Sequence, residues 1–166
     1  MGTDKALLAV VGVPLARRVA DALTEAGAER VLAVGGDLVG LRAQGLDVVA
    51  DQHPGEGPLG GILTAMAATD AEVVMVLACD LPAVDPATIR TVVEALGDAD
   101  VAAPWADGRH ELLHAAYSRR AAGPLRAAFA AGERAPQRAV SGLTVVSVTG
   151  LAPGSLADAD TPDDLP

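Results

Sequence analysis

Carboxylates stand at the ends of apolar segments in this 166-residue sequence, and such positions suit the binding of metal ions and phosphates. Asp51 follows LDVVA, Asp80 follows VVMVLAC, and Asp158 and Asp160 come after the last apolar segment. Ligands of open α/β sheets bind outside the carboxyl ends of the strands. Asp80 is the clearest candidate, because a carboxylate that ends a buried strand is costly unless it is paired or binds a metal ion. A helix cap or turn is the alternative for Asp51 and Asp80.

The net charge of the chain indicates which kinds of ligand it can bind. There are 22 acidic and 12 basic residues, which gives a net charge of −10, and no run of basic residues exceeds two. Nucleic-acid-binding proteins carry a basic patch, so we expect no direct binding of nucleic acid. An acidic protein that handles phosphates does so through Mg²⁺ and backbone N–H groups. We therefore expect Mg²⁺ as the cofactor.

A glycine-rich loop precedes the strongest apolar segment. Residues 55–60, GEGPLG, match the pattern G-x-G-x-x-G, and Asp80 lies 20 residues beyond Gly60. This outline is typical of dinucleotide-binding proteins, in which the loop directly follows a strand. Here residues 52–54 separate the loop from a weak strand, and Pro58 removes one backbone N–H group from it. A nicotinamide or flavin site is therefore the less favoured interpretation.

Histidine and cysteine give weaker signals. His110 and His114 are four residues apart, but no third ligand accompanies them, so a zinc site is disfavoured. Cys79 belongs to an apolar segment with no base implied, and we expect a buried structural residue rather than a nucleophile. It is the only cysteine, so no disulfide forms within the chain, which fits a reducing cytoplasm.

Short apolar segments alternate with helical patterns along the chain. This alternation predicts an α/β fold with a Rossmann-like, mostly parallel sheet flanked by helices, in a single domain. The predicted strands are residues 6–11, 30–36, 46–51, 72–80, 100–105, 112–117 and 143–148. The predicted helices are residues 15–26 with Gly27 as a stop, 59–68, 119–133, and one that begins at Pro86 with Asp85 as its cap.

The apolar run near the N-terminus, ALLAVVGVPLA, superficially resembles a secretory signal. Asp4 before the run, Gly12 and Pro14 inside it, and Arg17 and Arg18 after it argue against export. No apolar run approaches the roughly 20 residues that a membrane span needs. We expect a cytoplasmic protein with no membrane partner.

Several motifs occur together in the order and rough spacing of one family. They are MGTDKALL with a following G-x-PL, D…PGEGPLGGI, LACDLP, LLHAAY, AGER and DADTPDDL. Over essentially its whole length the chain resembles the molybdenum cofactor guanylyltransferases, which are MobA-like nucleotidyltransferases. The resemblance implies a nucleotide-diphospho-sugar-transferase-like fold. It also implies Mg²⁺-dependent transfer of GMP from GTP to the phosphate of molybdopterin, with release of pyrophosphate.

The resemblance also implies roles for residues of this sequence. Lys5 would neutralise the GTP phosphates, Asp51 would contribute to nucleotide binding, and Asp80 would act with Lys5 in catalysis and hold Mg²⁺. Asp160 would lie near the metal ion, and Arg134 is either a contact to the pterin phosphate or a surface residue. The glycine loop would approach the nucleotide or the pterin closely, because glycine leaves room for a ligand; its residues are Gly57, Pro58, Leu59, Gly60 and Gly61.

The chain departs from the family pattern at both ends. Family members carry a first strand and a loop like L-A-G-G-x-x-x-R-M-G, and this sequence begins at the last two residues of that loop, Met1 and Gly2. We expect Met1 to be an internal methionine, and residues 1–166 to be one MobA-like domain truncated at the N-terminus and clipped at the C-terminus. The family's asparagine near Val34 is absent, which leaves the identity of the base open.

Two other functions stay open. Within enzymes, the alternative is a molybdopterin cytidylyltransferase or a sugar-phosphate nucleotidyltransferase, against which GPLGGI favours the guanylyl assignment. Outside enzymes, it is a degenerate, non-catalytic domain that binds a nucleotide or a partner. The joint presence of Lys5, Asp51, Asp80 and Asp160 opposes that alternative. By family analogy alone, a molybdoenzyme chaperone is an expected partner.

Overall fold

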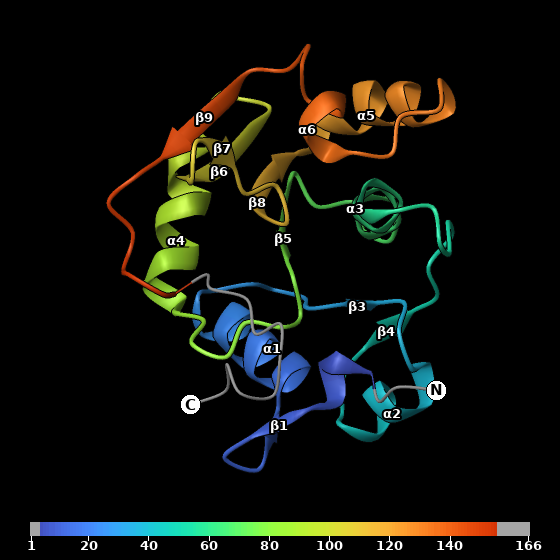
Figure 1. Cartoon of the computed structure of the whole chain (residues 1–166), viewed down its shortest axis with the longest axis vertical. Helices are drawn as coiled ribbons and strands as arrows, with labels where there is room; N and C mark the ends of the chain where they lie inside the picture. Colours follow the sequence, from blue (N-terminus) through green and yellow to red (C-terminus); the bar gives the residue numbers. More distant parts are fainter. Residues whose placement is uncertain (1–3, 156–166) are drawn as a thin grey trace. The chain divides into compact units, whose positions relative to one another are not determined.

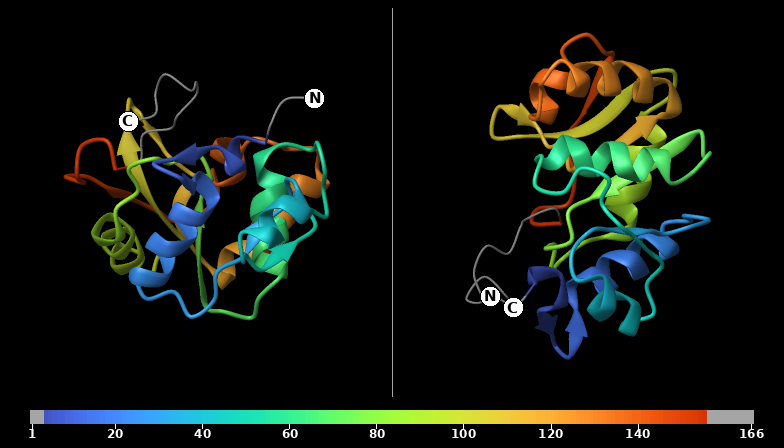
Figure 2. Two further views of the ribbon diagram at one scale, coloured as in Figure 1. Left: turned by 90° about the horizontal axis from the view of Figure 1, so that it is seen from below. Right: turned by 90° about the vertical axis from the view of Figure 1, so that its right-hand side faces the viewer.

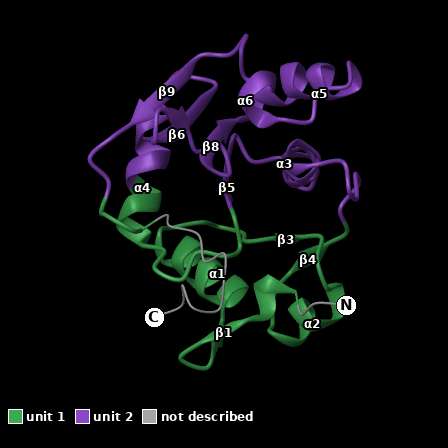
Figure 3. Ribbon diagram, in the orientation of Figure 1, with its two compact units in different colours: residues 1–50, 78–90, 152–166 green, residues 51–77, 91–151 purple. Residues whose placement is uncertain are grey.

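A computed structural model of the protein describes residues 4–155, which divide between two units of the chain (Figure 1, Figure 3). Unit 1 comprises residues 1–50, 78–90 and 152–166, and unit 2 comprises residues 51–77 and 91–151. The chain passes from unit 1 to unit 2 and back twice, and each unit has its own hydrophobic cluster. The prediction of a single domain over residues 1–166 stays a prediction.

Unit 1 begins with a short 3₁₀ helix where the sequence predicted a strand over residues 6–11. The helix η1 covers Lys5–Leu7, and the Asp4 side chain caps it by accepting a hydrogen bond from the Ala6 backbone N–H at 3.1 Å. Only then do two short antiparallel strands follow, β1 at Ala9–Val10 and β2 at Val13–Pro14. Capping by Asp4 satisfies the N–H groups of the first turn locally, which is why the apolar run is not one strand.

The helix α1, Leu15–Glu25, confirms the predicted helix and its stop. Its buried residues recur at helical spacing and comprise Leu15, Ala16, Val19, Ala20 and Ala22. At its end the N–H of Ala28 donates to the carbonyl of Leu23, and Gly27 takes φ +104°. This left-handed conformation suits glycine and closes the last turn in a Schellman arrangement.

The rest of unit 1 is built on a small β-α-β motif. Strands β3, Ala33–Val34, and β4, Val48–Val49, are parallel and are joined by the helix α2, Leu38–Ala43. The predicted strands 30–36 and 46–51 therefore exist but are only two residues long. The hydrophobic cluster of unit 1 has four buried residues: Ala6, Ala16, Leu41 and Val48.

The helix α4, Pro86–Ala95, begins in unit 1 and confirms the predicted cap. The Asp85 carboxylate accepts hydrogen bonds from the Ala87 and Thr88 N–H groups at 3.2 and 3.0 Å and from the Thr88 hydroxyl at 3.0 Å. These bonds favour the ionised carboxylate and lower the pKa of Asp85. The Thr88 hydroxyl also bonds that of Ser155 at 3.2 Å, within unit 1.

Unit 2 is organised around a mixed sheet with the order β5-β8-β6, to which β7 and β9 add on β6. Strand β8 is antiparallel to both β5 and β6, and β9 is parallel to β6. The strands are β5 Val73–Leu77, β6 Val101–Ala106, β7 Arg109–His110, β8 His114–Ser118 and β9 Val145–Val148. The α/β class with flanking helices is confirmed, and the sheet is mixed where a mostly parallel one was expected.

Strand β8 runs antiparallel to β6 because a hairpin in unit 2 reverses the chain before it. Strand β7 turns back on β6 through Asp107 and Gly108, whose φ angles are +49° and +78°. An Asp-Gly pair is a strong signal for such a two-residue hairpin turn. The chain therefore returns in the opposite direction before β8. The single tryptophan, Trp105, lies on this hairpin, 45% exposed and edge-on to the ring of His110.

Helices cover both faces of the sheet of unit 2 (Figure 1, Figure 2). On one face lie α3, Pro58–Ala67, α5, Ala122–Ala130, and α6, Pro136–Ala139; the 3₁₀ helix η2, Arg119–Ala121, leads into α5. The C-terminal part of α4 packs on the other face. Successive strand residues alternate between the two faces, with Ala115 and Tyr117 toward α3 and α5 and Ala116 toward α4.

The described residues include no helix that is long and apolar enough to cross a membrane.

Tyr117, the only tyrosine, is fully buried in unit 2, and its hydroxyl donates a 2.6 Å hydrogen bond to the Leu112 carbonyl. We expect Tyr117→Phe to lower the free energy of unfolding by about 1–3 kcal/mol, because the carbonyl loses its partner inside the core. Urea unfolding of both proteins measures this difference. An unchanged midpoint with an unchanged slope would contradict the expectation.

Candidate active site

Two predicted site residues of unit 1, Lys5 and Asp80, act on the same thiol although they are far apart in the sequence. Lys5 opens η1, and Asp80 follows the end of β5. Burial and, secondarily, the carboxylates of Asp80 and Asp4 raise the pKa of the Cys79 thiol to about 11, whereas Lys5 lowers it. Lys5, Asp4 and Asp80 thus all act electrostatically on the Cys79 thiol within unit 1.

Cys79 differs from its prediction as a buried strand residue. Strand β5 ends at Leu77, two residues earlier, and the cysteine reaches the surface, although burial is still the largest cause of its raised pKa. Such a pKa keeps the thiol protonated at neutral pH, so Cys79 is not an activated nucleophile.

Asp4 positions Lys5, a role that the sequence analysis missed. Besides capping η1, the Asp4 carboxylate accepts a 2.8 Å hydrogen bond from the Asp37 N–H. A Cβ atom on Gly36 would lie 2.8 Å from an Asp4 carboxylate oxygen, and Gly36 has φ +71°. Two reasons therefore favour glycine at position 36: its left-handed backbone conformation and the close approach of the Asp4 carboxylate. Spacing along the sequence does not signal this role, because Asp4 and Gly36 lie in distant segments of the chain.

Asp80 has a free carboxylate. It is half-buried and makes no hydrogen bond or ion pair with any of residues 4–155. Mg²⁺ is held in phosphate-transferring sites by one or two carboxylates together with substrate phosphates and water. An uncommitted carboxylate fits that chemistry. No group of three His, Cys, Asp or Glu side chains within the described part of the chain is placed to hold a metal ion without a substrate.

Asp51 anchors the glycine loop in unit 2. Its Oδ1 accepts hydrogen bonds from the His53 N–H and from the Thr64 hydroxyl of α3, both at 2.9 Å. Thr64 Oγ1 in turn accepts from the Gln52 N–H at 3.1 Å. The structure thus shows the turn role that was the alternative for Asp51, and its role in nucleotide binding stays a prediction.

The glycine loop leads directly into α3. Gly55 and Gly57 have φ +77° and +82°, and Gly57 is the N-cap residue of α3 with Pro58 in the first turn. At Gly60 a Cβ atom would lie 2.8 Å from the Cβ of His53, so the loop folds tightly over the start of the helix. The predicted residues of this loop differ in exposure: Gly57 and Pro58 are exposed, whereas Leu59 is fully buried.

Leu59 and Gly61 mark the two sides of that first turn. Leu59 is fully buried in the core of unit 2, so its side chain does not reach a ligand, and its part in nucleotide binding through the loop stays a prediction. A Cβ atom on Gly61 would meet nothing within 4 Å, so open space lies beside the backbone there. A ligand of unit 2 can approach the backbone closely at Gly61.

Arg134 holds the glycine loop against α5. Its guanidinium donates to the Glu56 carboxylate at 2.6 Å and to the carbonyls of Phe129 and Glu133 at 2.8 and 2.9 Å. It also lies 3.9 Å above the Phe129 ring, whose centroid is 4.5 Å from that of His53. These contacts occupy the guanidinium, and the contact to a pterin phosphate stays a prediction.

Glu133 fixes the turn that carries Arg134. Its carboxylate accepts from the Arg134 and Ala135 N–H groups at 2.7 and 2.8 Å and from the Arg138 guanidinium at 2.6 and 2.7 Å. The Arg138 bond is the largest cause that lowers the pKa of Glu133 to about 2, followed by the bond from Ala135. The motif AGER is therefore a structural connector between α5 and α6.

The predicted site residues are distributed over both units. Lys5 and Asp80 belong to unit 1, whereas Asp51, the loop from Gly57 to Gly61 and Arg134 belong to unit 2. Asp160, the second predicted metal ligand, lies outside the described residues.

Comparison with known proteins supplies the family. The family described as the MobA-like NTP transferase domain matches residues 1–146. The chain belongs to this family. The predicted resemblance and the assignment as a nucleotidyltransferase are thereby confirmed, and so is the fold of nucleotide-diphospho-sugar transferases.

Named relatives match most of the chain. A "Probable molybdenum cofactor guanylyltransferase" of Chloroflexus aggregans is 34% identical, over 99% of this chain and 85% of that protein. A "Molybdenum cofactor guanylyltransferase" of Pseudomonas putida is 31% identical, over 91% of this chain and 78% of that protein.

Solved structures share the fold. The molybdopterin-guanine dinucleotide biosynthesis protein A of Archaeoglobus fulgidus has a TM-score of 0.78 at 25% identity, covering 99% of this chain and 88% of its own. The 2-C-methyl-D-erythritol 4-phosphate cytidylyltransferase of Thermus thermophilus has a TM-score of 0.75 at 20% identity, covering 97% and 90%. The second likeness shows the fold alone, and the fold does not decide the base.

Arg134→Ala removes the contacts that hold the glycine loop. We expect faster amide hydrogen exchange in residues 53–57 and a loss of about 1–2 kcal/mol of stability, since the side chain is 40% exposed and its ion pair with Glu56 contributes little. Exchange measured by mass spectrometry tests this. Arg17→Ala, which removes an exposed ion pair of unit 1, is the control and should leave the loop unchanged.

Glu133→Gln tests the pH dependence that follows from its lowered pKa. A carboxyl group with a pKa of about 2 in the folded chain, against an ordinary value of 4.5, stabilises the fold above pH 4.5 and loses that contribution as the pH falls toward 2. We expect the wild type to be more stable than the variant at pH 6 and the difference to shrink between pH 4.5 and 2. Denaturant titrations across this range would contradict the assignment if the difference stayed constant.

Proposed function

We propose that the chain transfers GMP from GTP to the phosphate of molybdopterin, with release of pyrophosphate and dependence on Mg²⁺. The observation that carries the proposal is the match over 99% of the chain to a relative named for this activity. The shared electrostatic effect of Lys5 and Asp80 on Cys79 and the free carboxylate of Asp80 support it, because a phosphate-transfer centre uses a cation and a carboxylate that can hold a metal ion.

In this proposal each site residue of unit 1 has a defined role. Lys5 provides a positive charge for the triphosphate, and Asp4 holds it in place through η1. Asp80 would hold Mg²⁺, which when bound neutralises phosphate charge. Asp160 is the further ligand proposed from the resemblance.

The reaction needs no general base from the protein. A phosphate monoester has a second pKa near 6 and is mostly dianionic at neutral pH, so its oxygen attacks the α-phosphorus of GTP directly. The new bond joins that oxygen to the α-phosphorus, the bond to the β-phosphate oxygen breaks, and pyrophosphate leaves. The chain then contributes positioning and charge neutralisation.

The glycine loop of unit 2 is proposed to contact the nucleotide or the pterin through its backbone. Open space beside Gly61 supports this, and Asp51 and Arg134 act by holding the loop. A cytoplasmic location and a molybdoenzyme chaperone as partner belong to the same proposal and rest on composition and family analogy.

Asp80→Asn tests the proposal. We expect the rate of molybdopterin guanine dinucleotide formation to fall on the order of 100-fold and GTP binding to lose its response to Mg²⁺, because the amide cannot neutralise the metal ion. Calorimetric titration with GTP, with and without Mg²⁺, accompanies the rate assay. Asp47→Asn, an exposed acid of unit 1 paired with Arg30, is the control and should keep full activity.

The same titrations, repeated with CTP, decide between the guanylyl, cytidylyl and degenerate alternatives. Tighter binding of CTP than of GTP would replace the guanylyl assignment by the cytidylyl one. Absence of binding to either nucleotide would contradict the enzyme and favour a degenerate domain.

A further inference from the structure

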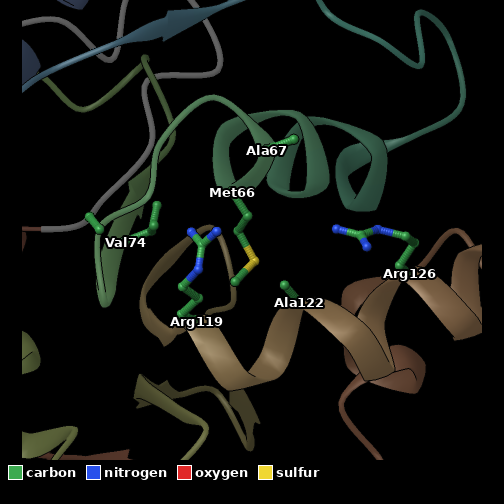
Figure 4. Close-up of a pocket in the computed structure, with 7 residues that line it drawn as sticks. Met66, Ala67, Val74, Arg119, Ala122 and Arg126 are labelled. Carbon is green, nitrogen blue, oxygen red and sulfur yellow. The ribbon is translucent and has the colours of Figure 1, made fainter.

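A pocket of about 300 Å³ lies in unit 2 between the end of α3 and the start of α5, and none of its lining residues was assigned to the candidate site. Met66 and Ala67 of α3, Val74 of β5 and Ala122 of α5 give it an apolar lining, and two arginines, Arg119 and Arg126, complete it (Figure 4). In Figure 4 the two guanidinium groups lie on either side of the Met66 side chain. Its volume is at the lower end of the range for small-molecule pockets.

Arg126 is exceptional among the arginines of this chain. Within residues 4–155, every other arginine donates a hydrogen bond to a carboxylate or a backbone carbonyl, whereas Arg126 contacts neither; the others are Arg17, Arg18, Arg30, Arg42, Arg90, Arg109, Arg119, Arg120, Arg134 and Arg138. Arg126 therefore stands apart in having a guanidinium that bonds neither a carboxylate nor a carbonyl of these residues. Its five donors are available to a ligand.

The scaffold around Arg126 sets its direction. Ala122 and Arg126 are four residues apart on α5 and therefore share one face of that helix, and both line the pocket. Two hydrogen bonds hold the Arg119 side chain in place. Its guanidinium donates to the Thr69 carbonyl at 2.9 Å and to the exposed carboxylate of Asp70 at 3.0 Å. Its remaining N–H groups supply a second positive edge.

We propose that this pocket binds a small anion attached to an apolar body. The two guanidinium groups are complementary to a carboxylate or a phosphate monoester, both of which accept paired hydrogen bonds from arginine. The lining from Met66, Val74 and Ala122 accepts a short alkyl or ring portion, which excludes water from the contact. The proposal does not depend on the proposed nucleotidyltransferase reaction.

The test uses four probes on the whole chain: hexyl phosphate, hexanoate, inorganic phosphate and 1-hexanol. Calorimetry gives the affinities, and amide chemical shifts locate the binding. We expect hexyl phosphate, hexanoate or both to bind at least tenfold more tightly than the other two, with shifts at residues 66–74 and 119–126. If only one of these two probes binds, its anionic group is the one that the pocket prefers.

Substitution of Arg126 makes the test specific. Arg126→Gln is expected to weaken binding about tenfold and Arg126→Glu to abolish it, since a charge-assisted hydrogen bond is lost or replaced by repulsion. Both variants should keep the wild-type melting temperature, because Arg126 contacts no described residue through its charge. Arg17→Gln, an exposed arginine of unit 1, is the matched control and should bind as the wild type does.

Several results would overturn the proposal. They are the absence of binding by both hexyl compounds with an anionic group, equal binding of 1-hexanol or inorganic phosphate, and unchanged binding in Arg126→Gln. Shifts confined to residues near Lys5 and Asp80 would likewise assign the probe to unit 1 and refute a site at Arg126.

Discussion

The burial of the central strand β8 is the constraint on which unit 2 depends. This strand lies between β5 and β6, and three consecutive residues, Ala115, Ala116 and Tyr117, are fully inaccessible. Alanine at the centre of the sheet allows α4 on one face and α3 with α5 on the other to approach closely, which replaces the aromatic residues that the composition lacks. The positions of the glycine loop and of Arg134 both follow from where α3 and α5 can pack.

Local sequence signals predicted the helices well and the short strands poorly. The helix that begins at Pro86 was predictable because Asp85 caps it, and α1 because its apolar spacing ends at Gly27. The helix α2 was missed, since Gly40 lies in its middle and only the Asp37 cap announces it. The first strand was overestimated, because the capping bond from Asp4 forms a 3₁₀ turn that apolar content does not reveal. The Asp107-Gly108 pair was a readable hairpin signal, and it explains the direction of β8.

The candidate site was predictable in its charged residues and not in its supports. Lys5 and Asp80 follow from the family motif and from a carboxylate at a strand end, and both affect the pKa of Cys79. The supports are Asp4, Glu56, Phe129 and Glu133, whose bonds join segments distant in the sequence, so spacing along the chain carries no trace of them. Leu59 shows the opposite case, because this motif position is fully buried and serves packing.

The placement of the single tryptophan has a spectroscopic consequence. Trp105 lies on the β6–β7 hairpin of unit 2, half-exposed and against the ring of His110. Intrinsic tryptophan fluorescence therefore reports on the sheet of unit 2 and is silent about unit 1, whereas far-ultraviolet circular dichroism sums the helices of both. Coincidence of the two signals during unfolding is a direct measure of whether the two units form one cooperative structure.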